Sequence, residues 1–88
     1  MISLTEEQIR AIVVHNISRK REQYINVHFA VKSLPPHLRN EALRIVKAMV
    51  KDGLLFAKKG DCVGIRRERI DEIHRLLEVY YSLKGGKV

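Results

Sequence analysis

The chain has 88 residues, of which 45% are hydrophobic and 31% are charged, and its formal net charge is +7 at pH 7. This length supports one small domain with a single core and leaves too little chain for a deep substrate cleft as well. Apolar runs are only a few residues long, so we expect no membrane-spanning helix, and the single cysteine, Cys62, excludes an internal disulfide.

The first helix is predicted to begin after Thr5. Thr5 and Gln8 have the spacing of a capping box, and acidic residues follow at the positive end of the helix dipole. The segment MISLTEEQIR has neither the charged leader nor the apolar stretch of a signal peptide. The use of a single cysteine favours an intracellular protein, and we expect a cytoplasmic one. Apolar residues then recur at helical spacing: Ile9, Ile12, Val13 and Ile17. The pattern fades over residues 18–21, where we expect the helix to end.

A short strand at residues 24–25 and a brief second helix over residues 27–33 are predicted next. Asn26 is the expected N-cap of that helix. Its apolar positions all fall on one face: Val27, Ala30, Val31 and Leu34. Pro35 and Pro36 end it, and Pro36 suits the first turn of a new helix because its missing N–H needs no partner there.

The third helix, from Pro36 to the residue before Gly53, has the clearest pattern. Its apolar residues form one continuous stripe: Leu38, Ala42, Ile45, Val46 and Met49. Gly53 follows the last residue of the stripe, at the position where a glycine in the left-handed conformation typically ends a helix. The opposite side carries only hydrogen-bond donors: His37, Asn40, Arg44, Lys47 and Lys51. Arg44 has the donors to bind guanine, Asn40 suits adenine, and lysines meet phosphates; the alternative is a basic face without a partner.

The segment KDGLLFAKKGDCVGIRR predicts a β-hairpin over residues 54–67, with Gly60 and Asp61 at its turn. A hairpin cannot stand alone, so we expect it to pack on the helices through four apolar residues: Leu54, Phe56, Val63 and Ile65. Its basic residues have two interpretations, contact with a polyanion or protection of an exposed strand edge.

A fourth helix is predicted over residues 68–84, with residues 85–88 as a frayed tail. Its apolar positions cover half of its circumference or more, wider than a core-facing stripe requires. We therefore predict that one strip covers the core and that the other pairs with a second copy of the chain. The predicted dimer interface is Leu76, Val79, Tyr80 and Leu83, beside the line of Ile70, Leu77 and Tyr81. The alternative is a monomer in which the first helix covers everything.

The net charge is concentrated in the middle of the chain. Residues 1–31 carry +1, residues 32–69 carry +6 and residues 70–88 carry 0. A localised basic surface indicates a polyanionic partner, most often nucleic acid. The alternative is a solvated face that serves solubility.

Four consecutive segments resemble a winged helix-turn-helix domain: VHFAVKS, LPP, HLRNEALRIVKAMVKDG and LLFAKKGDCVGIRR. The chain is similar to small archaeal and bacterial transcription regulators of the MarR/ArsR-like sort over residues 5–67. The resemblance implies one domain over residues 1–88, mainly α with a small β-hairpin (α+β), with three core helices, a wing and a C-terminal helix. The two prolines and the segment SRKREQ depart from the usual pattern.

The resemblance, taken with the charges, predicts a homodimeric regulator that binds double-stranded DNA, without a cofactor and without enzymatic activity. The groove-facing residues would be His37, Arg39, Asn40, Arg44 and Lys47. The phosphate contacts would be Lys51, Lys58, Lys59, Arg66 and Arg67. The main alternative is a winged helix that docks on another protein. RNA binding is the weaker alternative, because the sequence offers no aromatic stacking platform.

Metal and catalytic motifs are not recognisable. The four histidines, at positions 15, 28, 37 and 74, share no metal-site spacing, and Cys62 has no CxxC partner. We therefore expect no metal site.

Overall fold

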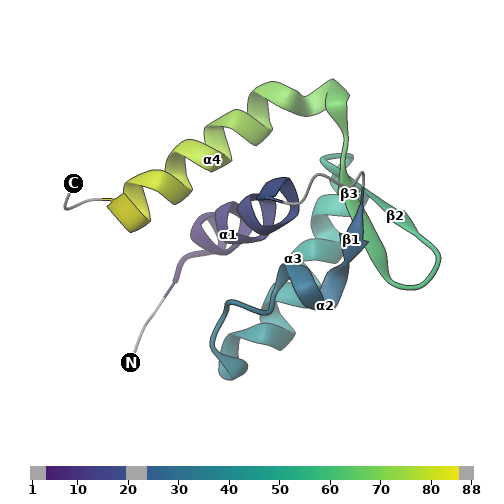
Figure 1. Ribbon diagram of the computed structural model, residues 1–88, viewed down its shortest axis with the longest axis horizontal. Helices are drawn as coiled ribbons and strands as arrows, with labels where there is room; N and C mark the ends of the chain where they lie inside the picture. The colour runs from purple at the N-terminus through teal and green to yellow at the C-terminus, as the bar shows by residue number, and fades with distance from the viewer. Residues whose placement is uncertain (1–3, 20–23, 86–88) are drawn as a thin grey trace.

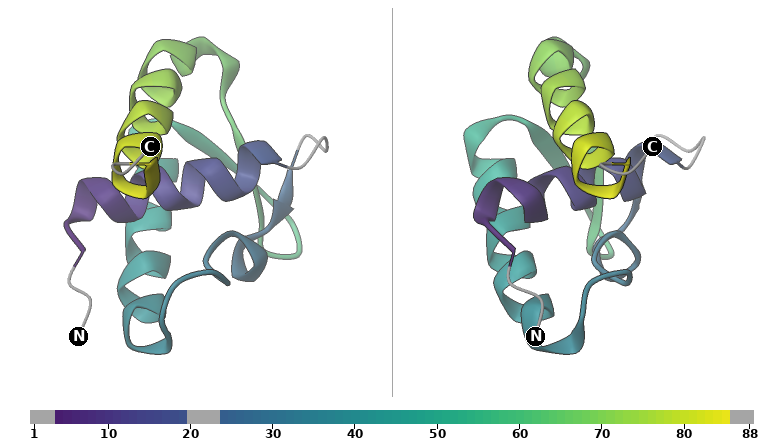
Figure 2. Two further views of the ribbon diagram at one scale, coloured as in Figure 1. Left: turned by 60° about the vertical axis from the view of Figure 1, so that its left-hand side comes forward. Right: turned by 90° about the vertical axis from the view of Figure 1, so that its left-hand side faces the viewer.

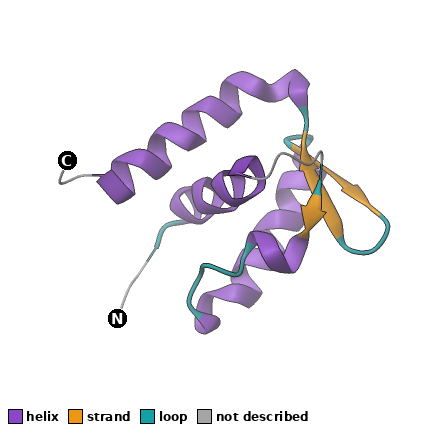
Figure 3. Ribbon diagram, viewed as in Figure 1, coloured by secondary structure: helices purple, strands orange, loops and turns teal. Residues whose placement is uncertain are grey.

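The computed structural model describes residues 4–19 and 24–85. The protein is mainly helical with a small three-stranded antiparallel sheet, which confirms the predicted α+β class (Figures 1 and 3). In chain order the elements are α1 (Glu6–Arg19), β1 (Ile25–Asn26), α2 (Val27–Ala30), α3 (Pro36–Asp52), β2 (Leu55–Lys58), β3 (Cys62–Ile65), a 3-10 turn (Arg67–Arg69) and α4 (Ile70–Gly85). No helix within the described ranges is both long and apolar enough to cross a membrane.

Helix α1 begins with the predicted capping box. The backbone N–H of Thr5 donates to Gln8 Oε1 over 3.0 Å, and the backbone N–H of Gln8 donates to Thr5 Oγ1 over 3.1 Å. Two orphan donors at the start of the helix are thereby satisfied. The helix ends at Arg19, within the predicted range.

Helix α1 is the centre of the fold, with α4 packed along one side and α3, α2 and the sheet on the other (Figures 1 and 2). Its buried positions therefore surround the helix more widely than the predicted face: Ile9, Ala11, Val13, Val14, Asn16 and Ile17. Ile12, which was predicted to be inward, is only partly buried. A helix covered on two sides has no wide polar face, so its sequence pattern is weakly amphipathic.

The second helix is shorter than predicted. Asn26 is its N-cap, as expected, and its side chain accepts a hydrogen bond of 2.9 Å from the His28 backbone N–H. The helix ends at Ala30, and turns continue to Ser33. The buried amide of Asn16 on α1 donates to Ala30 O over 2.7 Å and to Ser33 Oγ over 2.9 Å. This contact fixes the end of α2 against α1 and satisfies a polar group that would be costly to bury unpaired.

Helix α3 has the predicted form. Pro36 is its first residue, and its buried residues are the five of the predicted stripe. Gly53 follows with φ of 89°, the left-handed conformation expected of a helix cap. Beyond the cap, Arg69 Nη1 donates to the Asp52 carbonyl over 3.0 Å, and the Arg69 guanidinium is also paired with Glu72. The C-terminus of α3 is therefore tied to the start of α4.

The sheet has the strand order β1-β3-β2, with every neighbouring pair antiparallel. Leu55 faces Ile65 and Ala57 faces Val63 across the hairpin. The prediction that Phe56 packs inward is wrong, since Leu55 is fully buried and Phe56 only partly so. The turn at Gly53 reverses the chain, so the strand alternation begins at Leu55 rather than at Leu54, which is also buried.

Helix α4 packs on α1 through the strip that was predicted to be the dimer interface. Leu76 is only 8% exposed and belongs to the core of the monomer, together with the fully buried Ile73. Tyr80 stacks on His15 of α1, with ring centroids 3.8 Å apart and planes 10° from parallel. Leu76 is therefore not accessible to a second copy, and its assignment to a dimer interface is wrong.

The other strip of α4 is the exposed one. Ile70 is 42% exposed and Tyr81 is 60% exposed, and Leu77, on the same line, is partly buried. We call these three residues the outer strip of α4. Of the predicted dimer residues, Val79 and Tyr80 pack against the monomer core and only Leu83 is exposed. The two strips have exchanged roles because α1 covers the side centred on Ile73 and Leu76.

Candidate nucleic-acid interface

The polar face of α3 is exposed as predicted. Each of its five donor-bearing side chains is on the surface: His37, Asn40, Arg44, Lys47 and Lys51. Glu41 is the acidic residue of α3 nearest to this face, and Asp52 lies at the last position of the helix. A helix that presents hydrogen-bond donors and positive charges over about four turns can place several of them against one polyanion.

Arg39 does not belong to that face. Its Nε donates to the Leu34 carbonyl and its Nη2 donates to the Lys32 carbonyl, both over 3.2 Å. The guanidinium of Arg39 is exposed but engaged by the turn between α2 and α3, so its role in the DNA groove stays a prediction. The role that the contacts support is to hold that turn, and with it the angle between the two helices.

The tip of the hairpin is fixed to the start of α2. Gly60 and Asp61 both have positive φ, 82° and 59°. The Asp61 carbonyl accepts a hydrogen bond of 2.7 Å from the Val27 backbone N–H, and the Gly60 carbonyl accepts one of 3.3 Å from the Asn26 side chain. The tip is thus held by contacts far apart in sequence rather than left as a free loop.

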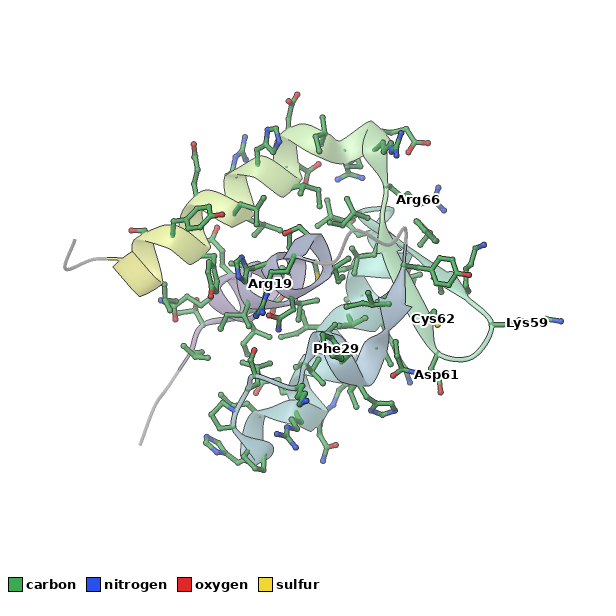
Figure 4. All side chains as sticks on the ribbon, viewed as in Figure 1. Arg19, Phe29, Lys59, Asp61, Cys62 and Arg66 are labelled. Atoms are coloured by element: carbon green, nitrogen blue, oxygen red, sulfur yellow. The ribbon has the colours of Figure 1, made fainter. Side chains whose placement is uncertain are left out.

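Two of the predicted phosphate contacts lie at this tip. Lys59 is exposed and projects away from the body of the protein (Figure 4). Lys58 is also exposed, and its ammonium lies 4.6 Å from the centroid of the Tyr24 ring. Such a cation–π contact at an exposed site is worth about 0.5–1 kcal/mol, so Lys58 is positioned but not locked.

Two more of the five predicted phosphate contacts, Arg66 and Arg67, lie at the opposite end of the hairpin. Arg66 is next to the start of α4 (Figure 4), and its backbone N–H donates to the Leu54 carbonyl over 3.1 Å. The four wing residues therefore form two separate basic sites, one at the tip and one at the base. Lys51, the remaining predicted phosphate contact, lies in the last turn of α3, just before the chain enters the hairpin.

A surface groove of about 390 Å³ runs between α3 and the hairpin, and we call it the α3–hairpin groove. Its floor is apolar and combines residues of both elements: Leu43, Val46, Val50, Ala57 and Val63. Leu43 and Val50 stand at the edge of the buried stripe of α3 and are only partly buried. The sequence pattern placed neither residue in a site, because an apolar residue at the edge of a stripe is ordinarily core.

The border of the same groove is polar. It contains His28 of α2, Lys47 of α3, and Lys58 and Asp61 of the hairpin. Lys47 and Lys58 come from the two basic regions that the sequence predicted separately, and the fold places them around one hollow. The partly buried Cys62 also lines it.

No family model, curated protein or solved structure matches this chain. The interface must therefore be judged by its own geometry.

The histidines do not gather into a metal site. Within residues 4–19 and 24–85, no group of three or more His, Cys, Asp or Glu side chains is placed to hold a metal ion. His15 is part of the aromatic stack between α1 and α4, whereas His28 is on the border of the groove. The chemistry that the surface offers is hydrogen-bond donation and positive charge.

Proposed function

We propose that this protein is a winged-helix protein that binds double-stranded DNA and regulates transcription. In this proposal α2 and α3 form the helix-turn-helix, α3 enters the major groove, and the hairpin is the wing on the DNA backbone. The observation that carries the proposal is the placement of Lys47 of α3 and Lys58 of the hairpin around one groove, beside the donor-bearing face of α3.

The face of α3 has the chemistry that base recognition requires. Asn40 and Arg44 are four residues apart, so both project from one side of the helix, one turn apart. Arginine binds guanine N7 and O6 through two hydrogen bonds, and asparagine binds adenine N6 and N7 in the same way. His37, at the N-terminal end of the same face, would contact an adjacent base or phosphate. The major groove is about 12 Å wide and admits one α-helix.

The attachment of α3 also favours this role. The Arg39 contacts hold the turn before the helix, and the Arg69 contact holds its end. A recognition helix fixed at both ends presents its side chains in one register, so less conformational entropy is lost on binding.

Backbone contacts would come from lysines on either side of this face. Lys47 and Lys51 extend along α3, and Lys58 and Lys59 approach from the hairpin tip. Arg66 and Arg67 follow the last residue of β3 at the hairpin base, so they would reach phosphates only on DNA that continues past α3 toward α4.

We propose further that two copies pair through the outer strip of α4. Ile70 and Tyr81 expose apolar surface there, which association would remove from water. Residues 70–88 have no net charge, whereas residues 32–69 carry +6, so two copies meet at α4 with the least electrostatic repulsion. A two-fold dimer would place two α3 helices on half-sites about one DNA turn apart.

The test is the salt dependence of binding to a labelled pool of random-sequence duplexes, measured by fluorescence anisotropy. With about four phosphate contacts per protomer, log K should fall with log salt with a slope of roughly −4 for a monomer and about twice that for a dimer. Selection of bound duplexes from the pool would then give the preferred site. The proposal fails if no duplex binds at low salt, or if binding does not depend on salt.

A further inference from the structure

The α3–hairpin groove has a property that binding to DNA does not use. Its floor is apolar and is formed by Leu43, Val46, Val50, Ala57 and Val63. These side chains cannot form hydrogen bonds with phosphates or base edges, and the group of DNA that they could contact is the thymine methyl. Val46 and Val63 are buried, whereas Leu43 and Val50 are partly buried and Ala57 is exposed, so apolar surface remains open to solvent in this hollow. A volume of about 390 Å³ lies in the lower part of the range of ligand-binding pockets.

The shape of the groove fits side chains delivered by a helix. One wall of the groove is helix α3 and the other is the hairpin. Leu43 and Val50 line the α3 wall, and they are seven residues, or about two helical turns, apart. An amphipathic helix presents apolar residues at i, i+3, i+4 and i+7, which is the spacing that such a groove accepts.

The border of the groove decides the charge of the partner. Lys47 and Lys58 carry positive charge, His28 adds a third nitrogen side chain, and Asp61 is the acidic residue at the hairpin turn. Lys58 is exposed and its ammonium lies over the Tyr24 ring, a weak contact from which it can turn toward a carboxylate. A second copy of this chain is disfavoured as the occupant of this basic region, because residues 32–69 carry +6.

We propose that the α3–hairpin groove binds an acidic amphipathic helix of a partner protein, with its apolar side chains on the floor and its carboxylates on Lys47 and Lys58. The inference rests on the proposed function in one respect. If DNA uses the same two lysines, the acidic helix and DNA exclude one another, and the partner acts as an inhibitor of DNA binding.

The probe is a fluorescein-labelled peptide of about 18 residues, or five helical turns, made of Ala, Leu, Phe, Asp and Glu with Leu and Phe at i, i+3, i+4 and i+7. One control peptide has the same composition with the apolar residues scattered around the helix. A second control has Asn and Gln in place of Asp and Glu. Binding to the intact chain is measured by anisotropy, and we expect a Kd near or below about 10 µM for the probe and at least tenfold weaker binding for both controls.

The location is tested with the protein's own thiol. Cys62 is the chain's single cysteine, it is only partly buried and it lines the groove, so the rate of its reaction with Ellman's reagent reports occupancy. The probe should slow this reaction at least fivefold, and the scattered control should not. An unchanged rate at saturating probe would place the peptide elsewhere and overturn the proposal.

The floor is tested by Leu43→Asn, with Ile12→Asn on α1 as the matched control for loss of a partly buried apolar side chain outside the groove. Leu43→Asn should weaken probe binding about tenfold and Ile12→Asn should leave it unchanged. Circular dichroism establishes that both variants fold, and Ala57→Asp, on the exposed edge of the floor, replaces Leu43→Asn if that variant does not. Equal binding by the parent and the floor variants would refute the assignment.

The same titrations separate this inference from the proposed function. If DNA binds with the expected salt dependence and the probe does not bind, the inference fails and the proposed function stands. If the probe binds in the groove and DNA does not bind, the chain is a protein-docking module instead. If both bind without displacing one another, the proposed inhibition is refuted.

Discussion

Helices α3 and α4 have nearly the same length, but the exposed side of α3 is polar and basic, whereas the exposed side of α4 includes the apolar residues of its outer strip. α3 buries one continuous stripe and exposes His37, Asn40, Arg44, Lys47 and Lys51, whereas α4 buries Ile73 and Leu76 and exposes apolar Ile70 and Tyr81. A helix with one apolar side has one possible orientation toward the core. A helix with apolar residues around half its circumference has at least two possible orientations, and the elements that pack against it decide which one occurs. The same contrast suggests different partners, a polyanion for α3 and an apolar surface for α4.

The largest expected effect concerns which strip of α4 is core. Leu76→Ala should lower the free energy of unfolding by about 2–4 kcal/mol, because it leaves a cavity against α1. Tyr81→Ala removes a largely exposed ring with edge contacts to His15 and Tyr80, so it should lower this free energy by no more than about 1 kcal/mol in the monomer. Urea unfolding at low protein concentration measures both. Equal losses for the two variants would remove the distinction between the strips.

The next effect tests base recognition by α3. Arg44→Ala or Asn40→Ala should weaken binding to the preferred duplex by roughly 1–3 kcal/mol and relax its base preference. Lys58→Ala combined with Lys59→Ala should weaken all duplexes about equally and make the salt slope shallower.

Arg75→Ala is the matched control, since Arg75 is an exposed arginine on α4 outside the proposed interface. If α3 and hairpin variants changed binding in the same sequence-independent way, α3 would not be reading bases.

The proposed dimer is tested with Ile70→Glu combined with Tyr81→Glu. These residues are exposed in the monomer, so the double variant should remain folded, while its dimer dissociation constant rises at least tenfold, or about 1.4 kcal/mol. Sedimentation equilibrium of the parent and the variant measures the association, with circular dichroism as the folding control. A parent that remains monomeric at high micromolar concentration would contradict the dimer.

The smallest effect concerns the contact that joins the two helices. Arg69→Met removes the hydrogen bond to the Asp52 carbonyl and the pairing with Glu72, both at a partly exposed site. We expect a loss of about 1 kcal/mol of stability, measured by thermal unfolding. Arg67→Met, next to it in the 3-10 turn and without such a contact in the described structure, should cost less. The same loss for both variants would mean that the contact does not join α3 to α4 in solution.

The sequence by itself determined the features that depend on neighbouring residues. The Thr5–Gln8 capping box, the N-cap at Asn26, Pro36 at the first position of α3 and the left-handed cap at Gly53 all occur as predicted. Each depends on backbone donors, dihedral angles or spacing within one or two turns. The stripe of α3 was equally readable, because its five apolar residues are continuous, although Leu43 and Val50 lie between this stripe and the donor-bearing face.

The tertiary structure decided everything that depends on which element covers which side. The packing of α1 on α4 made Leu76 core and left Ile70 and Tyr81 outside. The turn at Gly53 shifted the hairpin alternation to Leu55, and the carbonyls of Leu34 and Lys32 engaged Arg39. The α3–hairpin groove joins residues 28 and 63 across thirty-five positions. No periodicity along the chain encodes such contacts, because they arise only when separate elements meet in space.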